Sequence, residues 1–154
     1  MRLQILKLFL RRLELTEGVT HQFLEILKER VNESPKFRSL GTIDCHMGIK
    51  SGSDVFAIKF ESFSCKNIDI WEEDRLRELD FYFEMLQDEW QDWFYTLAGE
   101  GAVVDRPGLN EMDLNHPGGI LRCSDELGRL KFFRYMNSLQ EFFNCINLTD
   151  LKEH

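Results

Sequence analysis

An alternation of apolar and polar side chains between residues 42 and 61 restricts the fold of this chain more than any other feature. The alternation runs through residues 42–50 and resumes in residues 55–61, after the turn-forming segment Ser51-Gly52-Ser53-Asp54. Its apolar positions are Ile43, Cys45, Met47, Ile49, Phe56, Ile58 and Phe60. A period of two predicts an antiparallel hairpin with one buried face, in which Lys50 faces Val55. A third short strand near residues 66–70 is compatible with the pattern.

Helical patterns lie on both sides of this hairpin. Residues 19–31 place Phe23, Leu24, Ile26, Leu27 and Val31 on one side of a helix, with Thr20 as the N-cap. A last helix is predicted to begin after Ser124 as its N-cap and to direct inward the residues Leu130, Phe133, Met136, Leu139, Phe143 and Ile146. Residues 2–15 are so densely apolar that both a buried helix and a strand fit them.

The central segment predicts one long helix over residues 70–98. Its apolar residues recur at alternating steps of three and four, at Leu76, Leu79, Phe83, Leu86, Trp90, Trp93 and Leu97, and Gly99 follows as a C-cap. The alternative is a strand over residues 79–83. A heptad seam of this kind also allows self-association, so the sequence leaves the oligomeric state open.

The fold class predicted from these elements is α+β. A small antiparallel sheet, the central hairpin, packs against several helices, one of them long and acidic. At 154 residues the chain fits a single globular domain, residues 1–154, and such a domain buries roughly 70% of its unfolded surface. No Pro/Gly-rich linker or internal repeat suggests a second domain.

The cysteines indicate free thiols. Cys45, Cys65, Cys123 and Cys145 are far apart, and no CxxC pair occurs, so neither a zinc site nor a thioredoxin-like motif is predicted. The predicted register places Cys45 opposite Phe60 and not opposite Cys65. We therefore predict unpaired thiols and a cytoplasmic location. No stretch reaches the roughly 18 apolar residues of a membrane span, and no membrane role is predicted.

The acidic residues of the predicted long helix form the leading candidate site. Between Asp69 and Asp92 there are ten acids and two bases, so this segment carries the same charge, −8, as the whole chain. Asp80, Glu84, Asp88 and Asp92 recur every four residues and would form one row, with Glu89 beside it. Like charges at this spacing destabilise a helix, which suggests a surface kept for a basic protein partner. The sign of the charge disfavours nucleic acid.

The alternative site is the Gly/Pro-rich loop, residues 99–123, which holds five of the ten glycines and two of the three prolines. Its candidate residues are Asp105, Glu111, Asp113 and His116, side chains suited to acid–base or metal chemistry. The run His116-Pro117-Gly118-Gly119 resembles the haem-ligand motif of the cytochrome b5 family. This family requires a second axial histidine a couple of dozen residues later, and the only later histidine here is the terminal His154, so no haem is predicted.

The functional prediction is therefore a non-enzymatic protein-binding module, similar in charge and size to immunity proteins or inhibitors. Catalytic residues, a metal and a cofactor are not predicted, although the sequence leaves enzyme activity undecided. The alternative is a small enzyme or ligand-binding protein with its site in the loop 99–123.

Overall fold

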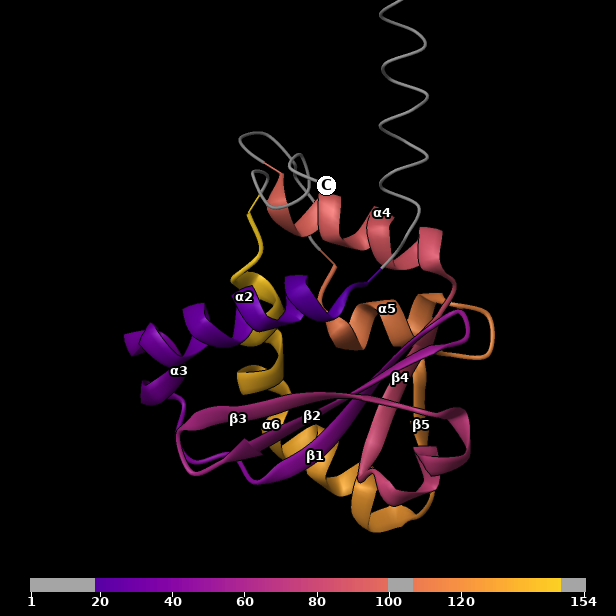
Figure 1. Cartoon of the computed structure of the whole chain (residues 1–154), viewed down its shortest axis with the longest axis horizontal. Coiled ribbons are helices and arrows are strands. Elements are labelled where there is room, and N and C mark those ends of the chain that lie inside the picture. The colour runs from indigo at the N-terminus through magenta and orange to yellow at the C-terminus, as the bar shows by residue number, and fades with distance from the viewer. Residues whose placement is uncertain (1–18, 100–106, 148–154) are drawn as a thin grey trace, which may run out of the picture.

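Five strands form one mixed sheet in the order β3-β2-β1-β4-β5, and helices pack on one of its faces (Figure 1). The structure is a computed structural model that describes residues 19–99 and 107–147. The strands are β1 (Cys45–Ser51), β2 (Asp54–Glu61), β3 (Ser64–Trp71), β4 (Phe81–Met85) and β5 (Leu121–Cys123). The α+β class is confirmed. The predicted segment 2–15 lies outside the described residues.

The predicted hairpin is present with its predicted register. Lys50 pairs with Val55 and Cys45 with Phe60 across β1 and β2, and β3 adds a third antiparallel strand beyond β2. The sheet as a whole is not purely antiparallel, because β1 pairs with β4 in parallel. Antiparallel pairing can be predicted from a short turn, whereas this parallel pairing joins strands that residues 52–80 separate in the sequence.

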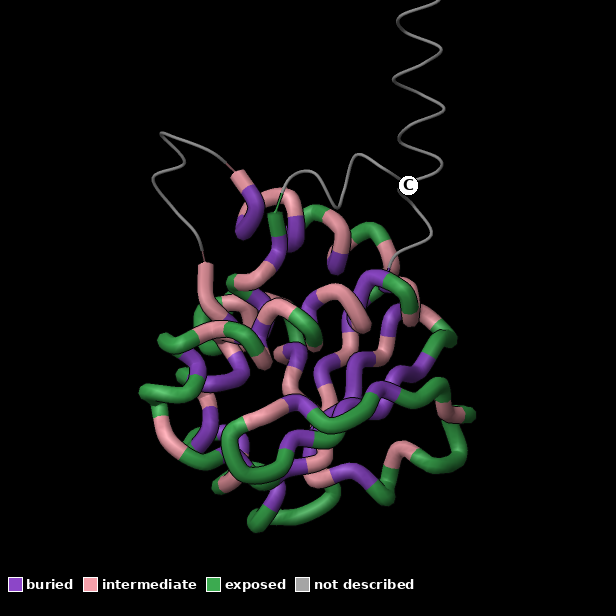
Figure 2. The backbone as a smooth tube through the Cα atoms, turned by 60° about the vertical axis from the view of Figure 1, so that its left-hand side comes forward, coloured by how far each residue is buried: buried purple, intermediate pink, exposed green. Residues whose placement is uncertain are grey.

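Helices α2 (His21–Glu33) and α6 (Glu126–Asn144) cover the face of the sheet that carries Met47 and Ile49. Thr20 caps α2 as predicted, and its hydroxyl accepts a hydrogen bond from the backbone N–H of Phe23. Helices α3 (Pro35–Ser39), α4 (Gln87–Ala98) and the short α5 (Leu109–Asn115) complete the fold. Most of the buried positions lie between the helices and the sheet (Figure 2). We call this side of the sheet the helix side.

The predicted long acidic helix over residues 70–98 is wrong. In its place the chain completes β3, forms the 3-10 turn η2 (Glu73–Glu78), enters strand β4 and only then begins α4. The strand alternative over residues 79–83 was the better interpretation. The alternation of buried Phe81, Phe83 and Met85 with partly exposed Tyr82 and Glu84 overrides the helical period here.

The crossing between β3 and β4 covers the opposite face of the sheet, which we call the outer side. Val55 and Ala57 point to this face and are nevertheless buried, at 1% and 0% exposure. Leu79 packs so closely over Gly48 that a Cβ at Gly48 would collide with it. The crossing segment therefore covers β1 and β2. Apolar residues spaced by three or four positions, which also predict a helix, suit this role.

Helix α6 is rotated relative to the prediction. Its N-cap is Asp125, one residue later than the predicted Ser124, and the side chain of Asp125 accepts from the backbone N–H of Gly128. Leu139, Phe143 and Ile146 are buried as predicted, but Leu130 and Phe133 are 63% and 49% exposed. Phe132, Tyr135 and Phe142 occupy the core instead.

The four cysteines are free thiols, as predicted. No helix within residues 19–99 and 107–147 has the length and apolar character needed to cross a membrane.

Candidate functional site

Among residues 19–99 and 107–147, no helix lies over one corner of the helix side of the sheet. Phe56 and its cross-strand partner Ile70 both point to this side. Phe56 is 4% exposed, whereas Ile70 is 69% exposed, although Ile68 on the same side of β3 is 4% exposed. Because α2 begins at His21 and α4 at Gln87, the first residues of these helices border the corner and do not cover it.

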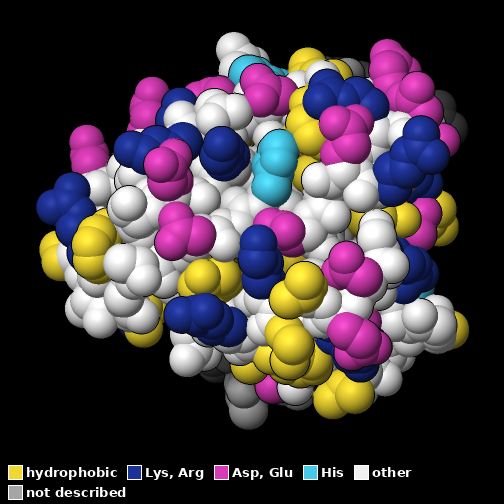
Figure 3. Space-filling model, turned by 90° about the horizontal axis from the view of Figure 1, so that it is seen from below, with side chains coloured by type: hydrophobic (Ala, Val, Ile, Leu, Met, Phe, Trp, Pro, Cys, Tyr) yellow, Lys and Arg dark blue, Asp and Glu magenta, His cyan; other side chains and the backbone are white. Residues whose placement is uncertain are grey.

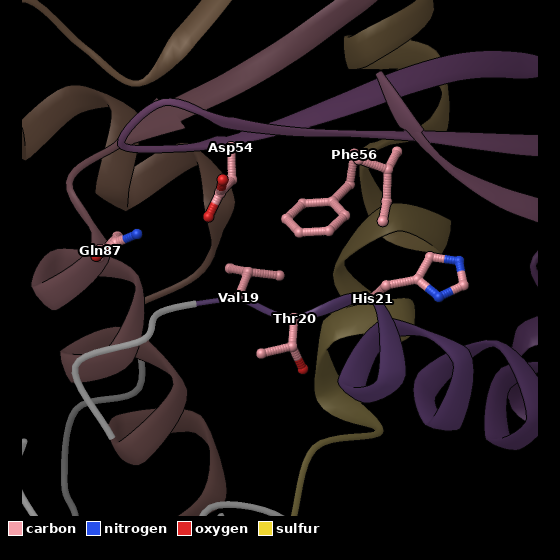
Figure 4. A pocket seen from close by; sticks show the side chains of 7 residues that line it. Val19, Thr20, His21, Asp54, Phe56 and Gln87 are labelled. Atoms are coloured by element: carbon pink, nitrogen blue, oxygen red, sulfur yellow. The ribbon is translucent and has the colours of Figure 1, made fainter. Parts of the chain in front are cut away.

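This corner forms an open pocket of about 540 Å³, which we call the corner pocket. Its lining residues come from four separate stretches of the chain and are Val19, Thr20, His21, Asp54, Phe56, Ile70 and Gln87. Figure 4 shows Phe56 and Asp54 pointing from β2 toward Val19, with Gln87 on one side and His21 on the other. The volume lies within the roughly 300–1,000 Å³ typical of small-molecule sites.

The corner pocket combines apolar walls with a polar rim of Thr20, His21, Asp54 and Gln87. Val19 and Phe56 are apolar and nearly fully buried. The carboxylate of Asp54 is exposed and has no hydrogen-bond or ion-pair partner among the described residues. The lining that the structure describes includes neither lysine nor arginine. Such a site suits a neutral ligand with a hydroxyl group, because Asp54 can accept a hydrogen bond but would repel a carboxylate or phosphate.

A second pocket, of about 570 Å³, lies on the outer side between η2, β4 and β5. It is lined by Glu73 and Asp74 as well as by Arg77 and Arg122. Arg122 is held in place, since its Nε atom lies 3.2 Å from the Glu84 carboxylate. The mixed charges indicate no particular class of ligand.

The predicted acidic row is divided among three elements. Asp80 precedes β4, and its carboxylate accepts from the backbone N–H of His46 at 2.8 Å and from Lys131 Nζ at 3.1 Å. Glu84 lies on β4 and accepts from Lys50 Nζ at 2.8 Å. The hydrogen bond from Lys50 lowers the pKa of Glu84, which is held as a carboxylate between Lys50 and Arg122. Both acids therefore bind internal cations.

The remaining acids of the row lie on α4. Glu89 accepts from the backbone N–H of Leu86 at 3.0 Å, which caps the helix, and its other oxygen lies 2.7 Å from His116 Nε2. Asp88 and Asp92 are both exposed. Acids at the start of a helix are stabilised by its dipole, so Asp88 and Glu89 need no partner to explain them. Binding of a basic protein at these residues stays a prediction.

The alternative loop site is only partly assembled. Asp105 lies outside the described residues. Asp113 accepts from the backbone N–H groups of Ile120 and Leu121, at 2.7 and 2.9 Å, and so closes the loop before β5. His116 is held by Glu89, and Glu111 is exposed. Neither pocket described above is lined by these four residues. Within the described residues, no group of three or more His, Cys, Asp and Glu side chains is placed to hold a metal ion.

Cys45 and His46 point to opposite sides of β1, as strand geometry requires. Burial raises the pKa of the Cys45 thiol strongly and that of Cys65 to about 12, so both remain protonated at neutral pH. A protonated, buried thiol is a poor nucleophile. These two cysteines therefore act as core side chains.

His46 predicts a pH dependence of stability. Burial lowers the pKa of His46 below the ordinary 6.5, and this effect outweighs the opposite effect of Asp80. The Nε2 atom of His46 is buried and has no hydrogen-bond partner among the described residues. The unfolded chain therefore takes up this proton at a higher pH than the folded chain does. We expect the free energy of unfolding to fall as the pH drops through about 6.5, measured by urea unfolding across this range.

Replacement of the imidazole isolates its contribution. The variant His46→Gln should lose part of this pH-dependent decrease. An unchanged slope in His46→Gln would show that His46 is not the responsible group.

Comparison with known proteins yields a likeness of fold. No protein-family model matches the chain, and no curated protein matches it. The chain is similar to the solution structure of a conserved hypothetical protein from Thermus thermophilus, described as a possible sterol carrier protein. The TM-score is 0.52 at 13% sequence identity, over 83% of this chain and 88% of that chain. At this identity the likeness shows the fold alone.

The sequence prediction missed the corner pocket altogether. Its residues are drawn from the starts of two helices and the ends of two strands, and no local motif joins them. Ile70 continues the alternation of β3, so its type gives no signal that it is exposed. Among the described residues, its exposure depends on where α2 and α4 begin. The start of α4 could not be predicted, because the incorrect helix over residues 70–98 includes it.

Proposed function

We propose that this protein is a non-enzymatic carrier of a small neutral lipid with a hydroxyl group, such as a sterol, bound in the corner pocket. The observation that supports this most is Ile70, which is 69% exposed on the helix side of the sheet, beside the buried Phe56, and has no helix over it among the described residues. An isoleucine on the helix side of a sheet is normally buried, and a bound apolar molecule would provide the missing cover.

The rim of the pocket supports the choice of a neutral ligand. Asp54 can accept a hydrogen bond from a ligand hydroxyl, and the amide of Gln87 can donate or accept one. A fatty acid would place its carboxylate near Asp54 with no lysine or arginine in the described lining to balance it. The structurally similar protein, described as a possible sterol carrier, is consistent with this ligand class at the level of the fold.

The proposal predicts that Ile70→Glu strongly weakens lipid binding without unfolding the protein. The new carboxylate would lie against the apolar ligand, and its desolvation should weaken binding by about tenfold or more. Because Ile70 is mostly exposed, the free energy of unfolding should change by no more than about 0.5 kcal/mol. Binding is measured by titrating the full-length protein with dehydroergosterol, a fluorescent sterol.

The matched control is Phe63→Glu. Phe63 is a half-exposed apolar residue at the other end of the β2–β3 hairpin, so it receives the same charge away from the pocket. This variant should bind the sterol normally. Equal loss in both variants, or no binding by the unmodified protein, would contradict the proposal.

A change of charge at Asp54 tests whether the pocket prefers a neutral lipid or an anionic one. The variant Asp54→Lys should improve binding of the fluorescent fatty acid cis-parinaric acid relative to dehydroergosterol. If the unmodified protein already prefers the fatty acid, the pocket is a lipid site of a different class.

A further inference from the structure

The solvent-facing side of α6 carries exposed apolar side chains that the core does not use. Leu127, Leu130 and Phe133 are 69%, 63% and 49% exposed. At about 100° per residue, Leu130 lies on the side of the helix opposite to Phe132 and Leu139, which are fully buried. We call these three exposed residues the α6 apolar face.

Basic residues border this face. Arg129 lies over the ring of Phe133, with its guanidinium carbon 5.8 Å from the ring centre. Arg134 is exposed beside Phe133 and packs its guanidinium 5.5 Å from the ring centre of Tyr135. Residues 126–134 contain three bases and one acid, in a chain whose net charge is −8. Figure 3 views the end of the molecule where α6 begins and shows hydrophobic side chains gathered beside Lys and Arg side chains.

From this arrangement we infer that the α6 apolar face docks on the surface of an anionic lipid membrane. An interfacial helix needs apolar side chains that enter the headgroup region and cations at their border that attract anionic lipids. Leu127, Leu130 and Phe133 supply the first, and Arg129 and Arg134 supply the second. The cations point to a negatively charged occupant.

A second copy of the chain fits this face less well. A two-fold contact joins the same surface of both copies, so it would bring the arginines of one α6 close to those of the other. An anionic bilayer instead neutralises Arg129 and Arg134 together. This inference does not depend on the corner pocket, which lies at the starts of α2 and α4, away from the start of α6 (Figure 1).

Vesicle co-sedimentation of the full-length protein tests the inference. We expect the protein to sediment with vesicles of phosphatidylcholine mixed with phosphatidylserine, and only weakly with vesicles of phosphatidylcholine alone. The double variant Leu130→Gln/Phe133→Gln should bind the anionic vesicles at least about tenfold more weakly. The double variant Arg129→Gln/Arg134→Gln should also bind about tenfold more weakly and lose most of the salt dependence.

Two control variants make the experiment specific. Phe63→Gln removes an exposed aromatic residue elsewhere on the surface and should sediment like the unmodified protein. Ile70→Glu, which alters the corner pocket, should also keep vesicle binding. Failure of the lipid-carrier proposal is therefore distinguishable from failure of membrane docking.

Three results would overturn the inference. The first is no sedimentation with anionic vesicles, and the second is sedimentation that persists in Leu130→Gln/Phe133→Gln. The third is a dimer, detected by sedimentation equilibrium, that this double variant abolishes, because the face would then be occupied by a second copy.

Discussion

Replacement of Gly128 by alanine is expected to destabilise the protein by about 3 kcal/mol or more, although the same change within an exposed helix stabilises it by about 1 kcal/mol. Gly128 lies in the first turn of α6 and is buried against the backbone of Asp80. A Cβ atom at this position would overlap the carbonyl oxygen of Asp80. Since a backbone carbonyl at the start of β4 cannot rotate away as a side chain can, α6 must move off the sheet.

The free energy of unfolding, obtained from urea denaturation, measures this effect. Arg129→Ala is the matched control, because it alters the next residue of the same helix on the exposed side and should change stability by no more than about 0.5 kcal/mol. A Gly128→Ala variant as stable as the unmodified protein would mean that α6 and β4 do not approach each other as described.

The second large effect is expected at Phe143. This side chain is fully buried and lies at the centre of an aromatic cluster, with ring-centre distances of 5.0 Å to Trp93, 6.1 Å to Trp90 and 6.4 Å to Phe83. It joins α6 to α4 and to the sheet. Phe143→Ala should therefore lower the free energy of unfolding by about 3–5 kcal/mol.

Phe133→Ala provides the control within the same helix and with the same chemical change. The Phe133 side chain is half exposed, so its loss should change stability by no more than about 0.5 kcal/mol. The periodicity of the sequence assigns both phenylalanines to the core. A similar loss of stability in the two variants would support that assignment and contradict the observed rotation of α6.

The elements that the sequence predicts well are those fixed by neighbours in the chain. The β1–β2 hairpin is set by the turn Ser51–Asp54 and by the alternation on either side, so even its register could be predicted. Helix α2 follows from the Thr20 cap and one apolar stripe. In both cases the local preference and the tertiary packing agree.

The errors in predicted secondary structure arise where the same residues fit both a helical period and the period of two of a strand. Leu79, Phe83, Trp90 and Trp93 are buried, as the predicted helix requires, but they lie on a crossing segment, a strand and a later helix. Phe81 and Met85 alternate with Phe83, and this period of two decides the structure because β4 pairs with β1. That pairing is distant in sequence, so no local window contains it.

The candidate sites show the same limit. The prediction that Asp80 and Glu84 belong to a free acidic surface depends on the incorrect helix, which places them in one row with Asp88 and Asp92. In the structure, Lys131 and Lys50 reach them from other elements and neutralise them. The corner pocket, conversely, exists only because α2 and α4 begin at particular places around Phe56 and Ile70.

The central claim is that a neutral lipid binds in the corner pocket, and the most direct test locates the ligand by NMR. Amide ¹H–¹⁵N spectra of the full-length protein would be recorded with and without the sterol dehydroergosterol. The account predicts that the largest shift changes occur at the amides of Thr20, His21, Asp54, Phe56 and Gln87 and are small along α6. Changes concentrated elsewhere, or a spectrum that the sterol leaves unaltered, would contradict it.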